Sequence, residues 1–401
     1  MKPVLRDEFQ SLEDLRAYFD QLRDFGDSFF VNPGLMVVTG YGPVRDILLD
    51  SAKFRSFDFG ERLRSLQAIS PEKYGFVDLQ ETISRWLVFM EGPEHLASRK
   101  RLTKAIYALD LPGIIQSEWE RMARSLDGRS RLELMTDLCE PLISRIVCAI
   151  IGMDPQQHSV LRNLEKAFLK ATSAFVSLDM LDEIRQAHHD FTTWVNQAWD
   201  SGSIHQARLL TNLLDNQEPD TQPAVLSQLE FLLTAAVETS ILILMESIFR
   251  LLTDLKERTA MLQNASSRKM LVEELIRLSS AVSFVTRRTL QDTTVAGLPC
   301  PAGTVLMLSI ASANRDPRHF PIPNQVHPDN LATPHLAFGL GRHHCIGSIL
   351  SRMELEAILP AFFQRFGDQA CLATGTREEI KRSYTITGIS RLQMTLNSPI
   401  P

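Results

Sequence analysis

The sequence predicts a mainly α-helical protein with small β-sheets, an α+β fold organised as a single domain over residues 1–401. Helical periodicity dominates from about residue 42 to residue 280. Short β-like runs appear near the N-terminus and return after residue 282. No internal repeat, low-complexity run or Gly/Ser-rich linker divides the chain, so we expect one compact unit with a long central helix.

The expected elements follow from local signals along the chain. Residues 11–25 place leucine and phenylalanine on one helical face, and Ser11 is a suitable N-cap. The segment Phe29–Thr39 predicts two short strands around the turn Asn32-Pro33-Gly34. Further helices are expected at 137–153, 187–199, 224–253 and 270–280, and further short strands between 282 and 308, including 293–295, and near 384–396.

The segment Phe231–Leu252 is apolar and approaches the length of a membrane span. It also carries Glu238, Glu246 and Arg250, whose charges are costly in lipid. We therefore expect a central helix that is buried on most sides of a soluble domain, and no membrane partner.

The composition argues against several classes of protein. The 401 residues carry 42 Lys and Arg against 48 Asp and Glu, a net charge of −6, so nucleic-acid binding through the overall field is not expected. The N-terminal run Met1–Glu8 turns acidic too early for a signal peptide. The five cysteines are odd in number, scattered and without a CxxC pair, which argues against a disulfide framework and indicates a reducing cytoplasm.

The most informative stretch is His335–Glu356, HLAFGLGRHHCIGSILSRMELE. Its run Phe338-Gly339-Leu340-Gly341 predicts a turn that approaches a neighbour closely, because glycine presents no side chain and tolerates unusual backbone angles. Cys345 and Gly347 then precede an amphipathic helix, and free N–H groups at a helix N-terminus favour a cysteine thiolate. Positive charge is added nearby by Arg342, His343 and Arg352.

Chemistry alone leaves several interpretations of Cys345 open. A buried structural cysteine is the common case for an arbitrary cysteine. A catalytic nucleophile is a second option, although no orienting pair is identifiable. A zinc site from His343, His344 and Cys345 is disfavoured, because adjacent ligands rarely share one tetrahedron and a fourth ligand is missing. A thiolate ligand to haem iron needs close glycines and cationic groups for the haem propionates, and the sequence has both.

The run Phe338-Gly-Leu-Gly-Arg-His343-His-Cys345-Ile-Gly347 matches the FGxGxHxCxG haem-binding loop of the cytochrome P450 family, so the chain resembles that family. The resemblance implies the cytochrome P450 fold and a haem b cofactor. By the same resemblance Cys345 is the axial thiolate and metal ligand, and His343 is a propionate partner. Phe338, Gly339 and Gly347 then belong to the cofactor-binding loop.

Other motifs extend the resemblance over nearly the whole chain. Glu274-Leu-Ile-Arg277 matches the ExxR motif, a structural pair whose i,i+3 spacing places both charges on one helical face. Arg287, five residues before Asp292, resembles the arginine that reaches a propionate, and the adjacent Arg288 is an alternative. Further matches are the PEHxxxR segment with His95 and Arg99, the segment Asn314-Arg-Asp-Pro317, and Phe320-Pro321.

The central helix carries Ala235-Ala-Val-Glu238-Thr239-Ser240 where the family usually shows AGxETT. By the resemblance Glu238 and Thr239 are catalytic residues that relay protons to dioxygen, and a threonine bonded to a preceding carbonyl would open the helix locally. Two positions depart from the family pattern. Ala236 replaces the usual glycine, and Asn330 stands where relatives carry the arginine that joins the ExxR pair.

The resemblance also implies where a substrate binds. The pocket is expected to draw on residues 56–89, 167–189, 232–239, 282–286 and 384–389, which mix apolar side chains such as Phe76 with a few polar ones. The expected lining residues are Leu233, Ala235, Ala236, Val282, Phe284, Val285, Ile386 and Thr387.

The activity implied is that of a monooxygenase that uses dioxygen to hydroxylate a mostly apolar small molecule, in secondary metabolism. No nucleotide-binding loop is present, so electrons are expected from a ferredoxin or flavodoxin partner. A basic patch for this acidic partner is expected from Arg99, Lys100, Arg101, Lys104, Arg342 and Arg352. A carrier protein that presents the substrate is one option. The alternatives are oxidative coupling or ring closure, and a haem-thiolate binding or sensing protein without turnover.

Overall fold

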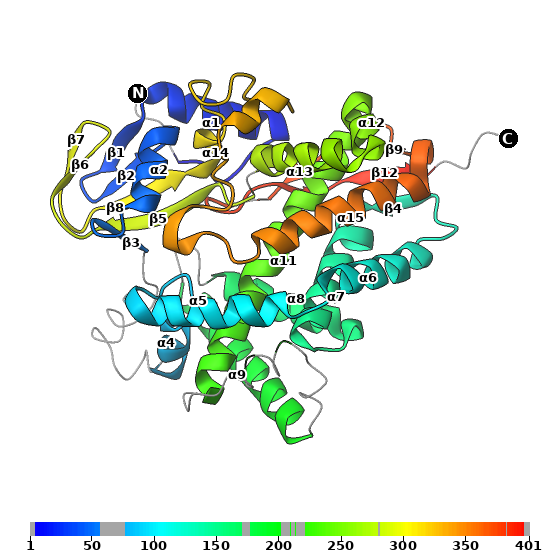
Figure 1. Cartoon of the computed structure of the whole chain (residues 1–401), viewed down its shortest axis with the longest axis horizontal. Helices are drawn as coiled ribbons and strands as arrows, with labels where there is room; N and C mark the ends of the chain where they lie inside the picture. The colour runs from blue at the N-terminus through cyan, green and yellow to red at the C-terminus, as the bar shows by residue number, and fades with distance from the viewer. Residues whose placement is uncertain are drawn as a thin grey trace. The chain divides into compact units, whose positions relative to one another are not determined.

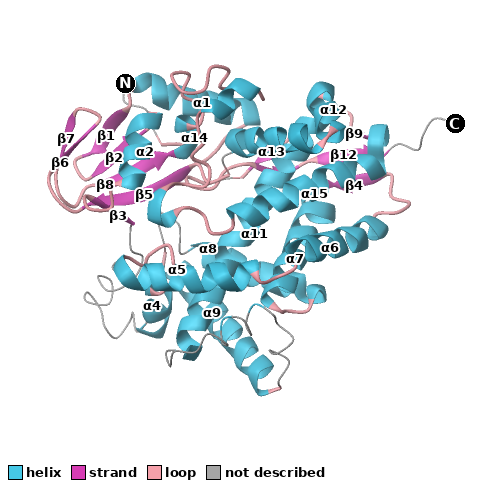
Figure 2. Ribbon diagram, in the orientation of Figure 1, coloured by secondary structure: helices cyan, strands magenta, loops and turns pink. Residues whose placement is uncertain are grey.

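A computed structural model of the chain (Figure 1) describes residues 5–56, 77–170, 177–201, 221–279, 281–381 and 383–396, together with Leu209 and Leu213. Residues 57–76, with Phe76, and residues 171–176 lie outside this description, so these parts of the expected pocket are not placed. Helices dominate the ribbon and the strands are short (Figure 2), which confirms the predicted mainly α fold with small β-sheets.

The chain divides into two compact units. The first unit comprises residues 1–55, 115–140 and 239–401, and the second comprises residues 56–114 and 141–238. The expectation of a single domain over residues 1–401 stays a prediction.

The first unit begins with the predicted helix and hairpin. Helix α1 (Leu12–Phe25) is capped by the Ser11 side chain, which accepts a hydrogen bond from the Asp14 backbone N–H at 3.1 Å. Strands β1 (Ser28–Asn32) and β2 (Leu35–Val38) pair antiparallel across the predicted turn. Helix α2 (Tyr41–Leu49) follows.

The largest sheet has the strand order β1-β2-β8-β5-β3. Its later strands are β3 (Phe54–Ser56), β5 (Phe284–Thr289) and β8 (Val305–Ser309), and β8 pairs parallel with β2 and antiparallel with β5. One face of this sheet packs against α2 through a core that includes Met36, Val38, Val44, Leu306 and Leu308.

The rest of the first unit is built around three helices, α12 (Leu255–Gln263), α13 (Ala265–Ser279) and α15 (Ser348–Phe366). Most of α6 (Leu111–Ser125), a π-helical turn at Met135–Cys139 and the short α14 (Ile310–Ala313) also belong to it. Short 3₁₀ turns lie at Pro328–Ala332, Gly341–His343 and Gly367–Gln369. Three small sheets are formed by β4 (Arg131–Glu133), β12 (Gln393–Leu396) and β9 (Ala370–Leu372), by β10 (Glu379–Ile380) and β11 (Ile389–Arg391), and by β6 (Thr293–Val295) and β7 (Leu298–Cys300).

The second unit is helical. It contains α4 (Val77–Ser84), α5 (Gly92–Tyr107), most of α7 (Glu140–Ile151), a 3₁₀ turn at Pro155–Gln157, α8 (His158–Leu169) and α9 (Leu178–Asp200). Its core includes the fully buried rings of Trp86, Phe168 and Phe191, which meet edge to face. The expected helices at 137–153 and 187–199 are therefore confirmed, with α9 starting earlier than predicted.

Helix α11 (Thr221–Thr253) runs through both units, and the boundary between them falls between Glu238 and Thr239. The stretch Ala224–Thr253 is long and apolar enough to cross a membrane, but an 18-residue window of it with a mean hydropathy of 1.7 is 72% buried. This burial is typical of the core helix of a soluble protein, as predicted.

Candidate functional site

The cysteine loop, Phe338–Gly347, lies in the first unit and leads into α15. Gly339 and Gly341 have φ values of +63° and +69°, a backbone conformation that favours glycine. A Cβ atom at Gly341 would come within 2.8 Å of the Leu48 carbonyl oxygen at the end of α2. The predicted close approach of this turn is therefore to α2.

Cys345 is held by the backbone of its own loop. Its N–H donates to the Phe338 carbonyl at 2.8 Å, and its own carbonyl accepts from the Ser348 N–H at 3.4 Å. The residue is exposed, and the 19-residue helix α15 begins three residues later at Ser348. An accessible sulfur near a helix N-terminus is placed where the helix dipole favours a thiolate.

The ExxR pair is fully buried, with Glu274 at 0% and Arg277 at 1% exposure. Arg277 donates to both Glu274 carboxylate oxygens at 2.6 and 2.8 Å, and to the backbone carbonyls of Asn314, Pro323 and Gln325 at 2.7 to 3.0 Å. Burial raises the pKa of Glu274, but its hydrogen bonds, above all those from Arg277, outweigh burial and hold this pKa below its usual value. The pair thus ties α13 to the 314–325 segment.

Asn330 takes part in this network although it replaces an arginine. Its side-chain amide donates to Glu274 at 2.8 Å and to the carbonyls of Ile322 and Gln325 at 3.0 and 3.2 Å. Its side-chain oxygen accepts from the Ile322 N–H at 3.1 Å. The Asn330 side chain is fully buried and neutral, so it joins the Glu274–Arg277 pair without adding a second buried cation.

The Asn314 segment connects the ExxR pair to the cysteine loop. The Asn314 carbonyl accepts from Arg277, and its side-chain oxygen accepts from the Leu336 N–H at 2.6 Å. The Leu336 carbonyl in turn accepts from the Gly339 N–H at 2.8 Å. Three consecutive contacts therefore fix the start of the loop relative to α13.

The register of the main sheet separates Arg287 from Arg288. Arg287 pairs with Leu306 and Val285 pairs with Leu308, so these side chains share one face of the sheet. Val285 and the loop residue Leu340 both pack against the core on that face. Arg288 points to the opposite face by strand alternation, which favours Arg287 of the two candidates.

Helix α5 in the second unit carries His95 and Arg99 one turn apart. His95 is fully buried and Arg99 is half-buried, whereas the expected basic patch residues Lys100, Arg101 and Lys104 are exposed. Two first-unit members of that patch are engaged within the protein. Arg352 forms an ion pair with Glu273, and Arg342 donates to the Ser51 hydroxyl at 2.5 Å.

Glu238 is buried and forms an ion pair with Arg162 of α8, which also pairs with Glu165. All three side chains are at most 6% exposed and belong to the second unit. Sequence reasoning missed Arg162 and Glu165. Their i,i+3 spacing is a visible signal, but 76 positions separate Arg162 from Glu238, and no local pattern predicts that contact.

The middle of α11 has one accessible stripe. Ala235 is exposed, and Leu232, Ala236 and Thr239, which lie within one or two turns on the same face, are half-buried. The helix stays α-helical through residues 235–240, so the expected local opening is not seen. Alanine at 236 favours this regular helix, because it is a much better helix former than glycine.

The remaining pocket candidates divide into two groups. Val282 and Ile386 form an isolated β-bridge, and the side chains of Ser283 and Thr387 are hydrogen-bonded, which brings the 282–286 and 384–389 segments together as expected. Leu233 is fully buried, away from the accessible stripe, and Phe284 is buried with its ring 5.9 Å from that of Phe19. Leu233 and Phe284 thus serve packing in this structure.

Sequence reasoning also missed Glu354 of α15. Its carboxyl group is buried, with 2% of the residue exposed, and hydrogen-bonds to the side chain of Ser240, the residue after Thr239 on α11. Burial raises the pKa of Glu354 to about 8, because the charged form is poorly solvated and the Ser240 hydrogen bond offsets this only in part.

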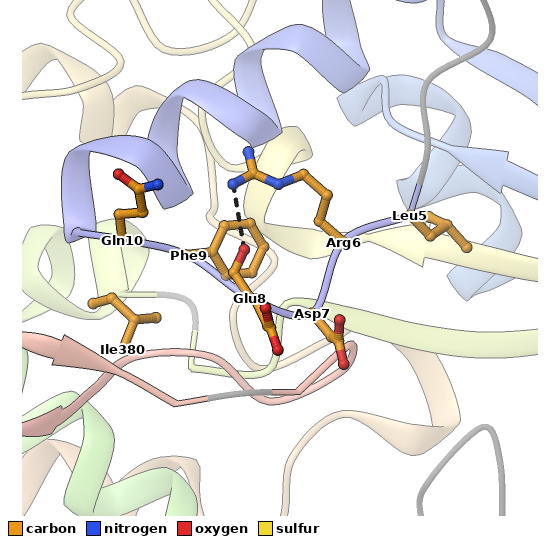
Figure 3. A pocket seen from close by; sticks show the side chains of 7 residues that line it. All are labelled: Leu5, Arg6, Asp7, Glu8, Phe9, Gln10 and Ile380. Carbon is orange, nitrogen blue, oxygen red and sulfur yellow. Dashed lines mark hydrogen bonds between the residues drawn. The ribbon is translucent and has the colours of Figure 1, made fainter.

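A cavity of about 620 Å³ lies elsewhere in the first unit (Figure 3). It is lined by residues 5–10 and Ile380, and none of the expected site residues contributes to it. Its cation, Arg6, is paired with Asp14 at 2.8 Å and donates to the Glu8 carbonyl at 3.3 Å. Over the described ranges, no group of three or more His, Cys, Asp or Glu side chains has the arrangement of a metal site.

Comparisons with known proteins find cytochrome P450 proteins. The family model "Cytochrome P450" matches residues 258–383. The chain is 28% identical to the putative cytochrome P450 140 of Mycobacterium tuberculosis, covering 94% of this chain and 88% of that protein. It is 26% identical to the mycinamicin IV hydroxylase/epoxidase of Micromonospora griseorubida, covering 71% of this chain and 73% of that protein.

A solved structure shows the same fold over nearly the whole chain. It is that of P450BioI in complex with hexadec-9Z-enoic acid ligated acyl carrier protein. The two share 22% identity with a TM-score of 0.82, and the match covers 96% of this chain and 99% of that one.

Proposed function

The chain belongs to the cytochrome P450 family, and on that premise we propose that it hydroxylates a mostly apolar small molecule in the cytoplasm, with electrons from a separate redox protein. Family membership makes the chain a haem-thiolate monooxygenase with haem b as its cofactor. The single observation that carries the proposal is the exposed Cys345, held by the Phe338 carbonyl in a loop of the family's pattern at the start of α15.

The residues present fit a haem group. The donor is an accessible cysteine near a helix N-terminus, and the preceding glycines adopt φ values that a side chain would disfavour. Arg287 lies on the sheet face that packs toward the loop, so it and His343 are the first-unit candidates for the propionates, with His95 and Arg99 as those of the second unit. Haem bound through a thiolate supplies dioxygen activation, and the thiolate favours cleavage of the O–O bond.

Dioxygen activation requires protons, which side chains of the protein must deliver. Thr239 lies on the accessible stripe of α11, and the adjacent Glu238 is held by Arg162. We assign the relay to these two residues, and the ion pair with Arg162 offsets the cost of burying the Glu238 carboxylate. General acid–base help of this kind contributes about 10² to 10⁴ in rate.

The substrate side is apolar. Leu232, Ala235 and Ala236 form most of the accessible stripe of α11. These side chains favour a ligand with a large hydrocarbon surface. A carrier-bound acyl chain is one such ligand, because a fold neighbour was solved with a fatty acid ligated to acyl carrier protein.

We assign the binding surface for the redox partner to α5. Lys100, Arg101 and Lys104 are exposed on it and can steer an acidic ferredoxin or flavodoxin by long-range attraction. Arg352 is left out of this surface, because its charge is paired with Glu273.

The reduced, carbon-monoxide-bound difference spectrum of the purified full chain tests the proposal. We expect a strongly red-shifted Soret band, followed by a substrate screen that reads the shift in haem spin state. A band at the ordinary histidine-haem position would show that Cys345 is protonated or displaced. A preparation without haem, after supplementation during expression, would overturn the proposal.

A further inference from the structure

Two consecutive carboxylates of α13 serve different parts of the chain. Glu274 binds the 325–330 segment through the His327 N–H at 3.0 Å and the Asn330 amide. Glu273, about 100° away around the helix, contacts His335 and Arg352 instead. His335 precedes the cysteine loop and Arg352 follows it, so one carboxylate contacts both flanks of the loop.

The contacts of Glu273 are specific in geometry. Arg352 donates to its two oxygens through Nε and Nη2, at 2.5 and 2.9 Å, in a bidentate fork. The Nε2 atom of His335 lies 3.2 Å from the oxygen that accepts Nη2. The Nδ1 atom of His335 accepts from the Ala337 N–H at 3.3 Å, so Nε2 carries the proton and donates to Glu273.

The two partners of Glu273 both face the ring of Phe338. The Arg352 guanidinium carbon lies 4.6 Å from the centre of this ring, within the range of a cation–π interaction. The ring of His335 lies 5.7 Å from it on centres. The carbonyl of Phe338 accepts the N–H of Cys345 at 2.8 Å. A chain of contacts thus leads from the Glu273 carboxylate to the backbone of the cysteine.

Glu273 is an anion in this setting. Burial raises its pKa, but the hydrogen bonds from His335 and Arg352 outweigh burial and hold the pKa at about 2. The carboxylate therefore stays ionised over the working pH range, and it offsets the charge of Arg352 beside the loop.

We propose that Glu273 is a positioning residue for Cys345. Its carboxylate binds one residue on each side of the cysteine loop, and through these residues, His335 and Arg352, it orients Phe338 and the Cys345 amide. The inference rests on the proposed role of Cys345 as the haem ligand. Without the carboxylate, Arg352 and His335 lose their shared acceptor, and the Phe338 ring loses its support. The thiolate is then less well oriented, and the uncompensated Arg352 charge favours the more reduced iron.

The chain offers a matched control for this test. Glu257 of α12 accepts Nε and Nη2 of Arg250 at 2.7 and 2.9 Å, the same bidentate fork, and neither residue touches the cysteine loop. The variants Glu273→Gln and Glu257→Gln each replace the acceptor of one such arginine fork by a neutral amide. An effect that arises only from losing an ion pair appears in both, whereas an effect on Cys345 appears only in the first.

The experiment uses the haem-loaded full chain and three readouts: the carbon-monoxide difference spectrum, the haem reduction potential, and hydrogen exchange at the Cys345 amide. For Glu273→Gln we expect at least a threefold rise in the non-thiolate fraction of the carbon-monoxide complex. We also expect a more positive potential and about tenfold faster exchange at Cys345, a loss of protection of about 1.4 kcal/mol. Glu257→Gln should match the wild type in all three.

Glu273→Asp keeps the charge and should recover part of each effect. If Glu273→Gln does not fold, Arg352→Lys serves in its place, because lysine keeps the charge but loses the fork and the stacking on Phe338. Wild-type readouts from Glu273→Gln, or from Arg352→Lys in its place, would overturn the proposal. A wild-type protein that shows no thiolate band would instead refute the haem-ligand assignment, so the two failures are distinguishable.

Discussion

Each unit of this chain buries a glutamate–arginine pair, and the two pairs are built differently. Glu274 and Arg277 lie one turn apart on α13. The two Nη groups of Arg277 donate to backbone carbonyls of the 314–330 segment, and the Asn330 amide of that segment donates to Glu274. Glu238 and Arg162 come from different helices, and Arg162 is shared with a second carboxylate, Glu165. The first arrangement stabilises a loop, whereas the second holds an acid beside a proposed catalytic threonine. Burial and charge pairing alone do not distinguish a structural pair from a functional one; the neighbours do.

The largest effect is expected from breaking the structural pair. Arg277→Met leaves the Glu274 carboxylate buried without its cation, which costs about 3–5 kcal/mol of unfolding free energy. Urea unfolding, followed by tryptophan fluorescence, measures this loss. Asn330→Ala removes a single hydrogen bond to the same carboxylate together with the Asn330 bonds to the Ile322 and Gln325 backbone, and leaves the arginine in place, so about 1–3 kcal/mol is expected for it. Equal losses in the two variants would contradict the central role of the ion pair.

Breaking the second pair, Glu238 and Arg162, should lower catalytic efficiency more than stability. Glu238→Gln keeps a hydrogen-bonding group toward Arg162 but cannot deliver a proton, so product formed per electron supplied should fall by about 10²-fold. Glu165→Gln is the control, because it removes the other carboxylate of the same arginine. It should stay within a fewfold of the wild type. Equal falls in both variants would assign Glu238 a structural role.

Glu354 is a third buried acid; its hydrogen-bond partner is a serine, and burial raises its pKa. Glu354 has a folded-state pKa of about 8, above the ordinary value of 4.5, so the folded protein binds the extra proton between these pH values. Its contribution to stability is fully present below pH 4.5 and is lost as the pH rises through about 8. The unfolding free energy should fall by up to about 1.4 kcal/mol per pH unit in this window.

Glu354→Gln does not titrate, so its stability should depend less on pH than that of the wild type. Unfolding free energies at pH 5.5 and 7.5, compared between the two proteins, measure the difference. Parallel pH profiles would show that Glu354 is not the proton-binding group.

The smallest effect is expected on the surface. Charge reversal at Lys100 and Arg101 should slow reduction by an acidic ferredoxin several-fold at low salt, and the difference should shrink as salt screens the attraction. Stopped-flow reduction at two ionic strengths measures it. The same reduction rate as the wild type at low salt would remove α5 from the partner surface.

The motifs that depend on neighbouring residues could be predicted from the sequence. The Ser11 cap, the hairpin at 28–38 and the Glu274–Arg277 pair each need only local spacing, and the structure confirms them. The cysteine loop is also local, because its glycines and Cys345 lie within ten residues. The mainly helical fold followed from periodicity for the same reason.

Contacts between distant segments could not be predicted in this way. Four of these contacts join residues that are far apart in the chain. They are the ion pair of Glu238 with Arg162, the contact of Glu273 with His335, the hydrogen bond of Asn330 to Glu274, and the hydrogen bond of Glu354 to Ser240. Strand register places Arg287 and Arg288 on opposite faces of the sheet, and burial places Leu233 and Phe284 in the core. The sequence by itself thus predicted the resemblance to a family, the mainly helical class and the candidate ligand cysteine, because each of these depends on spacing between residues that are close in the chain. The tertiary structure alone decided which charges from distant segments meet, because such a buried ion pair forms only where packing brings two desolvated groups together.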